Sequence, residues 1–227
     1  MTRTYRPLVA LTLLLFLQGC ASAPSVKPAK ITAEIISSPA GVEMSYRGRV
    51  VGNAPLELEI DSLDEAVELA TTQDEPPIIE RRIKVLGPER IQITIRLGSE
   101  PSPLARALGL SKVVVFDYGS LITFDSDSYE LREDLLPVLQ RQAEVLKSYF
   151  KGLDVYVCGH TDATGGEEHN QILSINRAQA VADYLMTQGL EKGRLRVQGF
   201  GKDYPVANNA TRDGRAANRR TEIVLPD

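Results

Sequence analysis

The sequence has few of the residues that most catalytic and nucleic-acid-binding sites need. Only two cysteines and two histidines occur among 227 residues. No HExxH pattern and no GxSxG elbow is present, so the usual ligands of a zinc site and the nucleophile of a serine hydrolase are missing. The formal net charge of −4 argues against the clustered positive charge by which proteins neutralise nucleic-acid phosphates. We therefore expect no enzyme activity, no metal or other cofactor and no nucleic-acid partner.

The cysteines are too few for a disulfide framework. Cys20 lies so near the N-terminus that pairing with Cys158 would tie a leader segment to the folded body, so we expect no disulfide. Cys158 and His160 fall on one face of a predicted strand and could form a nucleophile and base, but such pairs normally come from separate elements. A small buried thiol is the interpretation we favour. A glycosidase would need two carboxylates in a cleft, whereas Glu167 and Glu168 are more typical of solvated loop charges.

An apolar run near the N-terminus is too short to span a membrane. It covers residues 8–17, whereas a spanning helix needs roughly 20 apolar residues. Arg3 and Arg6 precede it as a positively charged n-region. We therefore expect residues 1–19 to be a signal peptide that is removed.

The sequence Leu17-Gln18-Gly19-Cys20 resembles the lipobox of bacterial lipoproteins. The resemblance implies that Cys20 is lipidated on its sulfur and becomes an acylated N-terminus. Two or more acyl chains hold a protein stably at a membrane, since each buried methylene contributes about 0.8 kcal/mol. Ala21, in place of an aspartate, implies the periplasmic face of the outer membrane. The alternative is ordinary secretory cleavage at Ala21 or Ala23, with loss of Cys20.

The next two segments differ in composition. Residues 20–30 are small and proline-rich, which predicts a flexible tether. Over residues 31–97, apolar side chains alternate with period two and predict a small antiparallel β module. Residues 38–56 of it (SPAGVEMSYRGRVVGNAPL) resemble the PEGA-type repeat of bacterial envelope proteins, and the resemblance fades beyond about Asp61. It implies a spacer or an interaction module without chemistry of its own.

The second half of the chain predicts an α+β domain. Residues 98–111 hold several serines and prolines and are expected to link the β module to this domain, residues 112–227. A first helix is expected from about Asp134, with Pro137 in its first turn, and a second ends at Gly189. Strands are expected at residues 113–116, 121–124, 153–157, 195–197 and 223–225. The pattern predicts a sandwich in which two helices cover one face of a sheet.

Two ionisable residues of this domain stand out. Asp162 follows a predicted strand at the start of a glycine-rich loop. Arg177 lies on the apolar stripe of the second helix, where its guanidinium needs a partner because a poorly paired buried ion costs several kcal/mol. The pair either clamps the helix to the loop, or it binds a ligand with both side chains exposed in the empty site.

Residues 112–227 resemble the OmpA C-terminal domain family of peptidoglycan-binding modules. The resemblance is carried by Gly159-His160-Thr161-Asp162, Gly165, Asn170, Leu173-Ser174, Arg177-Ala178, Gly199-Phe200-Gly201, Pro205, Asn209, Gly214-Arg215 and Asn218-Arg219-Arg220. It implies that Asp162 and Arg177 hold the ammonium and the carboxylate of diaminopimelate in the stem peptide of the wall, a chemistry that suits both side chains.

The family resemblance also suggests which residues complete this pocket. They are Thr161, Asn170, Phe124 and Asp125. Two positions depart from the family pattern, because His169 stands where tyrosine is usual and Thr221 where valine is common. Neither departure affects the charged pair.

Four arginines near the C-terminus are open to two interpretations. Arg212, Arg215, Arg219 and Arg220 could contact glycan or lipid headgroups, but we favour a role in clamping the fold for Arg219 and Arg220. The sequence as a whole predicts an outer-membrane lipoprotein that tethers the envelope to peptidoglycan. The alternatives are a signalling or assembly factor whose β module contacts another envelope protein and, less favoured, a peptidoglycan hydrolase.

The anchor can be tested by removing the sulfur that would be lipidated. Cys20→Ala should yield a protein that is no longer lipid-modified and no longer floats with outer membranes, because no acyl chain can be attached. Mass spectrometry and density-gradient flotation measure both effects. An unchanged mass and unchanged flotation would rule out lipidation at Cys20.

Overall fold

The structure is a computed structural model that describes residues 30–73, 75–87, 89–118, 124–125 and 127–227. Cys20, the expected signal peptide and the expected tether up to residue 29 lie outside the described residues. So does most of the strand expected at residues 121–124.

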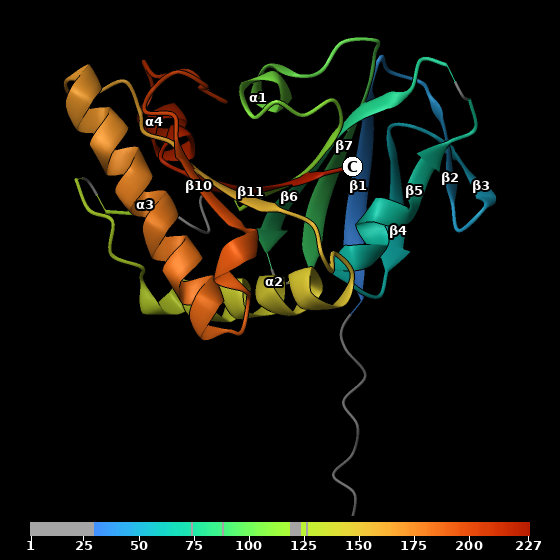
Figure 1. Ribbon diagram of the computed structural model, residues 1–227. Helices are drawn as coiled ribbons and strands as arrows, with labels where there is room; N and C mark the ends of the chain where they lie inside the picture. The colour runs from blue at the N-terminus through green and yellow to red at the C-terminus, as the bar shows by residue number, and fades with distance from the viewer. Residues whose placement is uncertain (1–29, 74, 88, 119–123, 126) are drawn as a thin grey trace, which may run out of the picture.

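One mixed sheet of eight strands runs through both halves of the described chain (Figure 1). Its strands lie in the order β10-β9-β11-β8-β6-β7-β1-β4. They are β1 (Ile31–Ser38), β4 (Leu56–Ile60), β6 (Ile78–Gly87), β7 (Arg90–Leu97), β8 (Val113–Asp117), β9 (Val155–Gly159), β10 (Leu195–Gly199) and β11 (Thr221–Pro226). A second sheet has the order β3-β2-β5, from β2 (Glu43–Tyr46), β3 (Arg49–Asn53) and β5 (Leu69–Thr71).

Helices cover both faces of the C-terminal part of the large sheet. The long helices α2 (Leu136–Ser148) and α3 (Glu167–Thr187) pack on one face, and α1 (Pro103–Ala107) packs on the other. The alternation of β8 explains this arrangement, since Val114 and Phe116 join the core with α2 and α3 while Val113 and Val115 face α1. Helix α4 (Arg212–Asn218) precedes β11. The predicted α+β sandwich with two helices on one face is confirmed.

The helix ends follow the expected local chemistry. Helix α2 begins one residue before Pro137, directly after the 3₁₀ turn η3 (Glu133–Leu135), so the proline sits where no helical amide bond is lost. The chain leaves α3 at Gly189, whose φ of +90° few other residues adopt. Two further 3₁₀ turns are η1 (Leu63–Glu68) and η4 (Lys192–Arg194).

The N-terminal half differs from the expected pattern in two respects. Strand β1 runs parallel to β7, with Ile35 opposite Ile93, so the pairing is not wholly antiparallel. The segment expected to be a linker contains α1, which the Ser102 side chain caps by accepting a hydrogen bond from the Ala105 amide. Leu104 and Ala105 of this helix are buried.

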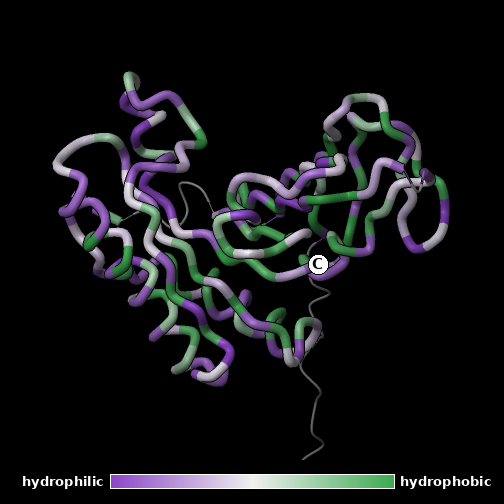
Figure 2. Tube along the Cα trace, turned by 45° about the horizontal axis from the view of Figure 1, so that its top comes forward, coloured by the Kyte–Doolittle hydropathy of each residue, from purple (hydrophilic) through white to green (hydrophobic). Residues whose placement is uncertain are grey.

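Hydrophobic stretches follow the strands and hydrophilic residues gather in the outer loops (Figure 2).

The two halves are joined where β6 pairs in parallel with β8, the β6–β8 junction. Arg82 of β6 crosses it and donates to Glu222 of β11 at 2.5 Å and to Asp117 of β8 at 3.4 Å. The same guanidinium donates to Glu80 at 3.0 Å. Burial alone would lower the pKa of Arg82, but the charges of Glu222, Glu80 and Asp117 outweigh burial and raise it. The junction is therefore closed by strand hydrogen bonds together with a desolvated group of charges.

A further contact joins the halves at the C-terminal end of α2. The Tyr149 hydroxyl bonds to the Asp64 carboxylate of η1, and this bond is the main reason that the pKa of Tyr149 is raised. Leu63 of the same turn belongs to the core cluster that contains Leu139 and Leu146 of α2. The described chain thus folds around a core shared by both halves.

The shared sheet predicts cooperative unfolding. Arg82→Met should destabilise the protein by roughly 3 to 5 kcal/mol, because it removes one charged partner from the buried carboxylates of Glu222 and Asp117. Urea unfolding followed by far-ultraviolet circular dichroism and by tyrosine fluorescence should show one transition that moves as a whole. Arg49→Met, at an exposed strand position, is the matched control. Two separate transitions, only one of them shifted, would contradict a shared folding unit.

Candidate functional site

A cavity of about 310 Å³ lies where the β9–α3 loop, the first turns of α3 and α4 meet. It is lined by Asp127, Thr161, Asp162, Thr164, Gly165, His169, Asn170, Leu173, Arg177, Arg215 and Arg219. Four of the six pocket residues expected from the sequence, Thr161, Asp162, Asn170 and Arg177, are therefore brought together.

Arg177 forms the inner wall of the cavity. Its Nε donates to the Ser128 carbonyl at 2.9 Å, its Nη2 to the Asp125 carbonyl at 3.2 Å and its Nη1 to the His160 carbonyl at 3.4 Å. The guanidinium carbon lies 5.1 Å from the centre of the Phe124 ring, within range of a cation–π contact. Arg177 therefore holds the chain around residues 124–128 against α3.

The expectation that both charged side chains are exposed in an empty site is wrong, because Asp162 is 8% exposed and Arg177 is 0% exposed. Three carbonyls and an aromatic ring surround the Arg177 guanidinium. Burial, followed by repulsion from Arg219, lowers the pKa of Arg177 to about 10. The guanidinium still carries its charge at neutral pH, so the cavity has a fixed positive wall.

Asp162 does not form the alternative structural pair with Arg177. Its Oδ2 accepts a hydrogen bond from Arg219 Nη1 at 2.8 Å, and its Oδ1 accepts one from the Thr164 amide at 2.8 Å. Burial raises the pKa of Asp162, but the hydrogen bonds from Arg219 and Thr164 outweigh it and lower the pKa overall. The sequence predicts only a fold-clamping role for Arg219, within the Asn218-Arg219-Arg220 run, and does not reveal Asp162 as its partner.

The remaining expected pocket residues lie at different depths. Thr161 and Asn170 line the cavity, and the Asn170 amide donates to the Thr164 carbonyl at 2.9 Å, which fixes the loop. Phe124 is buried behind Arg177, and Asp125 contributes its carbonyl to that guanidinium. Phe124 and Asp125 do not line the cavity; they contact Arg177 from behind and support it.

A histidine and an aspartate lie close together at the outer rim of the cavity. His169 Nε2 lies 2.7 Å from Asp127 Oδ1, and both side chains are exposed. Arg215 donates to the carbonyls of Asn209 and Ala210. The cavity thus presents separate positive and negative groups, a distribution that suits a small zwitterionic ligand.

The residues that suggested catalysis lie elsewhere. Cys158 is fully buried, and burial raises the pKa of its thiol well above the ordinary value, which disfavours the reactive thiolate. His160 stacks on Phe200 with ring centres 5.5 Å apart, and its Nε2 lies 3.4 Å from Glu222. Burial also lowers the pKa of His160. Neither residue lines the cavity.

The described residues contain no cluster of three or more His, Cys, Asp or Glu side chains able to hold a metal ion. None of the helices in this part of the chain has the length and apolar character needed to cross a membrane.

Known proteins with similar sequences show the family to which this chain belongs. Residues 123–219 match the model of the OmpA family. Outer membrane protein A of Bordetella avium is 31% identical over 140 residues, which cover 61% of this chain and 67% of that protein. The chain therefore belongs to the OmpA family.

Other relatives are similar over the same part of the chain. The probable lipoprotein YiaD of Escherichia coli is 44% identical over 112 residues, 49% of this chain and 51% of that protein. The peptidoglycan-binding protein ArfA of Mycobacterium tuberculosis is 36% identical over 135 residues, 60% of this chain and 41% of that protein. The matches therefore span about half of these relatives or less. The peptidoglycan-associated lipoprotein of Burkholderia pseudomallei is 33% identical, with 46% of this chain and 87% of that chain covered and a TM-score of 0.43.

The ion pair of Asp162 leads to a pH-dependent prediction. Arg219→Gln should raise the pKa of Asp162, because the charged donor that offsets burial is lost. A carboxyl whose pKa is lowered by folding contributes stability above its ordinary pKa, near 3.8, and loses it as the pH falls through the lowered value. In Arg219→Gln the contribution should therefore be smaller, and its loss should be complete at a higher pH. A side-chain carboxyl NMR titration, assigned with Asp162→Asn, measures the shift, and an unchanged pKa would show that Thr164 alone sets it.

Proposed function

We propose that the protein binds peptidoglycan non-covalently and that the cavity between α3 and α4 holds the amino-acid end of a diaminopimelate stem peptide. The observation that carries the proposal is the separate placement of Asp162 and Arg177 on one cavity wall, each held by other partners. The two charges do not neutralise each other, so each keeps its charge for a zwitterion, and the buried Arg177 would reach the ligand by a local movement of the chain that covers it. Relatives named for peptidoglycan binding and association support the same ligand class.

The hydrogen-bond inventory leaves room for such a ligand. A guanidinium carries five N–H donors, and Arg177 uses three of them for backbone carbonyls, so two remain for a carboxylate. The Asp162 carboxylate accepts two hydrogen bonds and has further lone pairs for an ammonium. Thr161 and Asn170 line the space between these groups and the loop. In this proposal Phe124 and Asp125 position Arg177 from behind and do not contact the ligand.

The biological role we propose is a tether between the outer membrane and the wall. The lipobox-like sequence at Cys20 supports an anchor on the periplasmic face, and a relative named as a probable lipoprotein supports the same arrangement. Residues 20–30 reach at most about 35 Å when fully extended, so the folded N-terminal half adds to the distance that the protein bridges.

Asp162→Asn tests the pocket with little change of shape. The amide keeps an acceptor for Thr164 but removes the charge that would bind an ammonium. Loss of one partner from a desolvated charge pair typically costs about 2 to 5 kcal/mol, or roughly 30-fold to several-thousand-fold in affinity. Co-sedimentation with purified sacculi measures the loss, with a melting curve as the check on folding. Asp61→Asn, at an exposed position outside the cavity, should bind normally.

The identity of the ligand requires a second comparison. Peptidoglycan with lysine in place of diaminopimelate lacks the carboxylate proposed to meet Arg177 and should bind far more weakly. Equal binding to both wall types would contradict the diaminopimelate assignment. Normal binding by Asp162→Asn would contradict the pocket itself, and release of soluble wall fragments would indicate an enzyme.

A further inference from the structure

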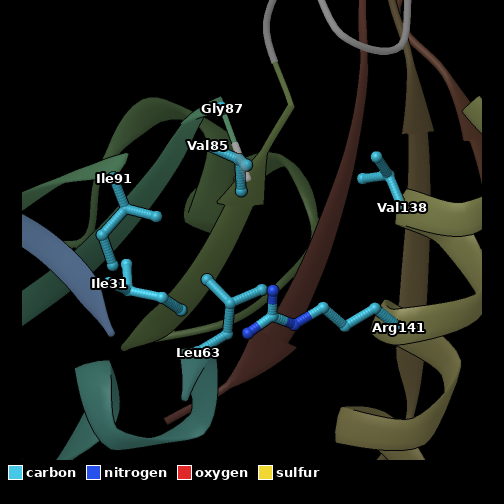
Figure 3. A pocket seen from close by; sticks show the side chains of 7 residues that line it. All are labelled: Ile31, Leu63, Val85, Gly87, Ile91, Val138 and Arg141. Carbon is cyan, nitrogen blue, oxygen red and sulfur yellow. The ribbon is translucent and has the colours of Figure 1, made fainter. Parts of the chain in front are cut away.

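A second cavity, of about 120 Å³, lies between the two halves and shares no lining residue with the proposed wall-binding site (Figure 3). Its wall is almost entirely aliphatic. The lining residues are Ile31 of β1, Leu63 of η1, Val85 and Gly87 of β6, Ile91 of β7, and Val138 and Arg141 of α2. Protein interiors rarely leave voids larger than a water molecule, so an opening of this size in an apolar wall needs an explanation.

Gly87 keeps the cavity open. A Cβ atom built at this glycine would meet no other atom within 4 Å, and its φ does not lie in the left-handed region. A larger side chain could therefore be accommodated at this position without backbone strain, and it would project into free space. Because Gly87 lines the cavity, the missing side chain at the end of β6 adds to the open space there.

Arg141 gives the apolar cavity one charged group. Its side chain reaches from α2 toward Leu63, across the side of the cavity opposite Ile31 and Ile91 (Figure 3). The residue is exposed, and within the described part of the chain its guanidinium makes no hydrogen bond or ion pair, although its charge acts on the buried hydroxyl of Tyr118. Arg141 is the one ionisable residue among those that line the cavity. An anionic group bound here would meet no competing carboxylate in the lining.

We propose that this cavity binds an aliphatic carboxylate, with the alkyl chain against Ile31, Val85 and Ile91 and the carboxylate on Arg141. A cavity of about 150 Å³ lined by aliphatic and aromatic side chains takes up benzene, so the present, smaller volume suits about five carbons of an alkyl chain. The guanidinium supplies a charge-assisted hydrogen bond at the mouth, where the carboxylate stays close to water. This site is independent of the proposed binding of peptidoglycan.

A series of straight-chain carboxylates tests the size of the site. The full chain carrying Cys20→Ala would be titrated in detergent-free buffer with butanoate, hexanoate, octanoate and decanoate by isothermal titration calorimetry. Each buried methylene should tighten binding roughly fourfold until the cavity is full, after which affinity should level off near six carbons. Affinity independent of chain length, or no measurable binding of octanoate, would overturn the proposal.

Matched variants then locate the two ends of the ligand. Gly87→Leu should abolish binding of octanoate and of octanol, whereas Gly193→Leu, at another glycine with free space around it, should not. Arg141→Gln should weaken octanoate about tenfold or more and leave octanol unchanged, since only the carboxylate uses the charge. Arg49→Gln is its exposed control.

The variants also separate this proposal from a general apolar site. Arg141→Gln lies on the surface of α2 and should fold normally, so it keeps the test decisive if Gly87→Leu is unstable. Equal loss of octanoate and octanol in Arg141→Gln, or binding that survives Gly87→Leu in a folded protein, would overturn the proposed site. Binding to sacculi should be the same in all four variants, because the two cavities share no residue.

Discussion

The Arg82–Glu222 ion pair is the constraint on which the arrangement of both halves depends. Glu222 is fully buried, and although burial raises its pKa, the charges of Arg82 and Arg220 lower it well below the ordinary value. Its second oxygen lies 3.4 Å from His160, and the carbonyl of His160 accepts a hydrogen bond from Arg177. A desolvated carboxylate is stable only with its full set of partners. Arg82 of β6 must therefore stay within reach of Glu222 on β11, across β8, for the inner wall of the proposed wall-binding cavity to remain in place.

In the proposed wall-binding cavity, the two charged residues are each held by other partners and do not pair with each other. Arg177 donates hydrogen bonds to backbone carbonyls, while Arg219 and the Thr164 amide donate to Asp162. Had the two pocket charges formed a direct ion pair, a zwitterion would have to break it before binding. In the proposed binding mode, fixing each charge separately removes that cost and sets the geometry before the ligand arrives, which is the usual advantage of a rigid site.

Local features of the chain were predictable, whereas most long-range partners were not. Periodicity located α2, α3 and β8, and Pro137 and Gly189 marked helix ends, because these signals act within a few residues. The parallel pairing of β1 with β7 and of β6 with β8 leaves no such signal, since alternation does not specify which strand lies alongside. The partners of Arg177 are backbone carbonyls, which every residue possesses, so its burial could not be inferred from side-chain types.

The continuous sheet changes how a tether would carry load. If the chain is anchored through Cys20 and bound to the wall at Asp162, as proposed, tension enters the fold at β1 and leaves it beyond β9. Between them lie β7, β6, β8 and β11, so the load crosses successive strand pairs instead of passing along a linker. The β6–β8 pairing is the step at which the two halves could separate, and Arg82 lies there with carboxylates from β8 and β11. Its ion pairs therefore resist separation of the two ends of the tether.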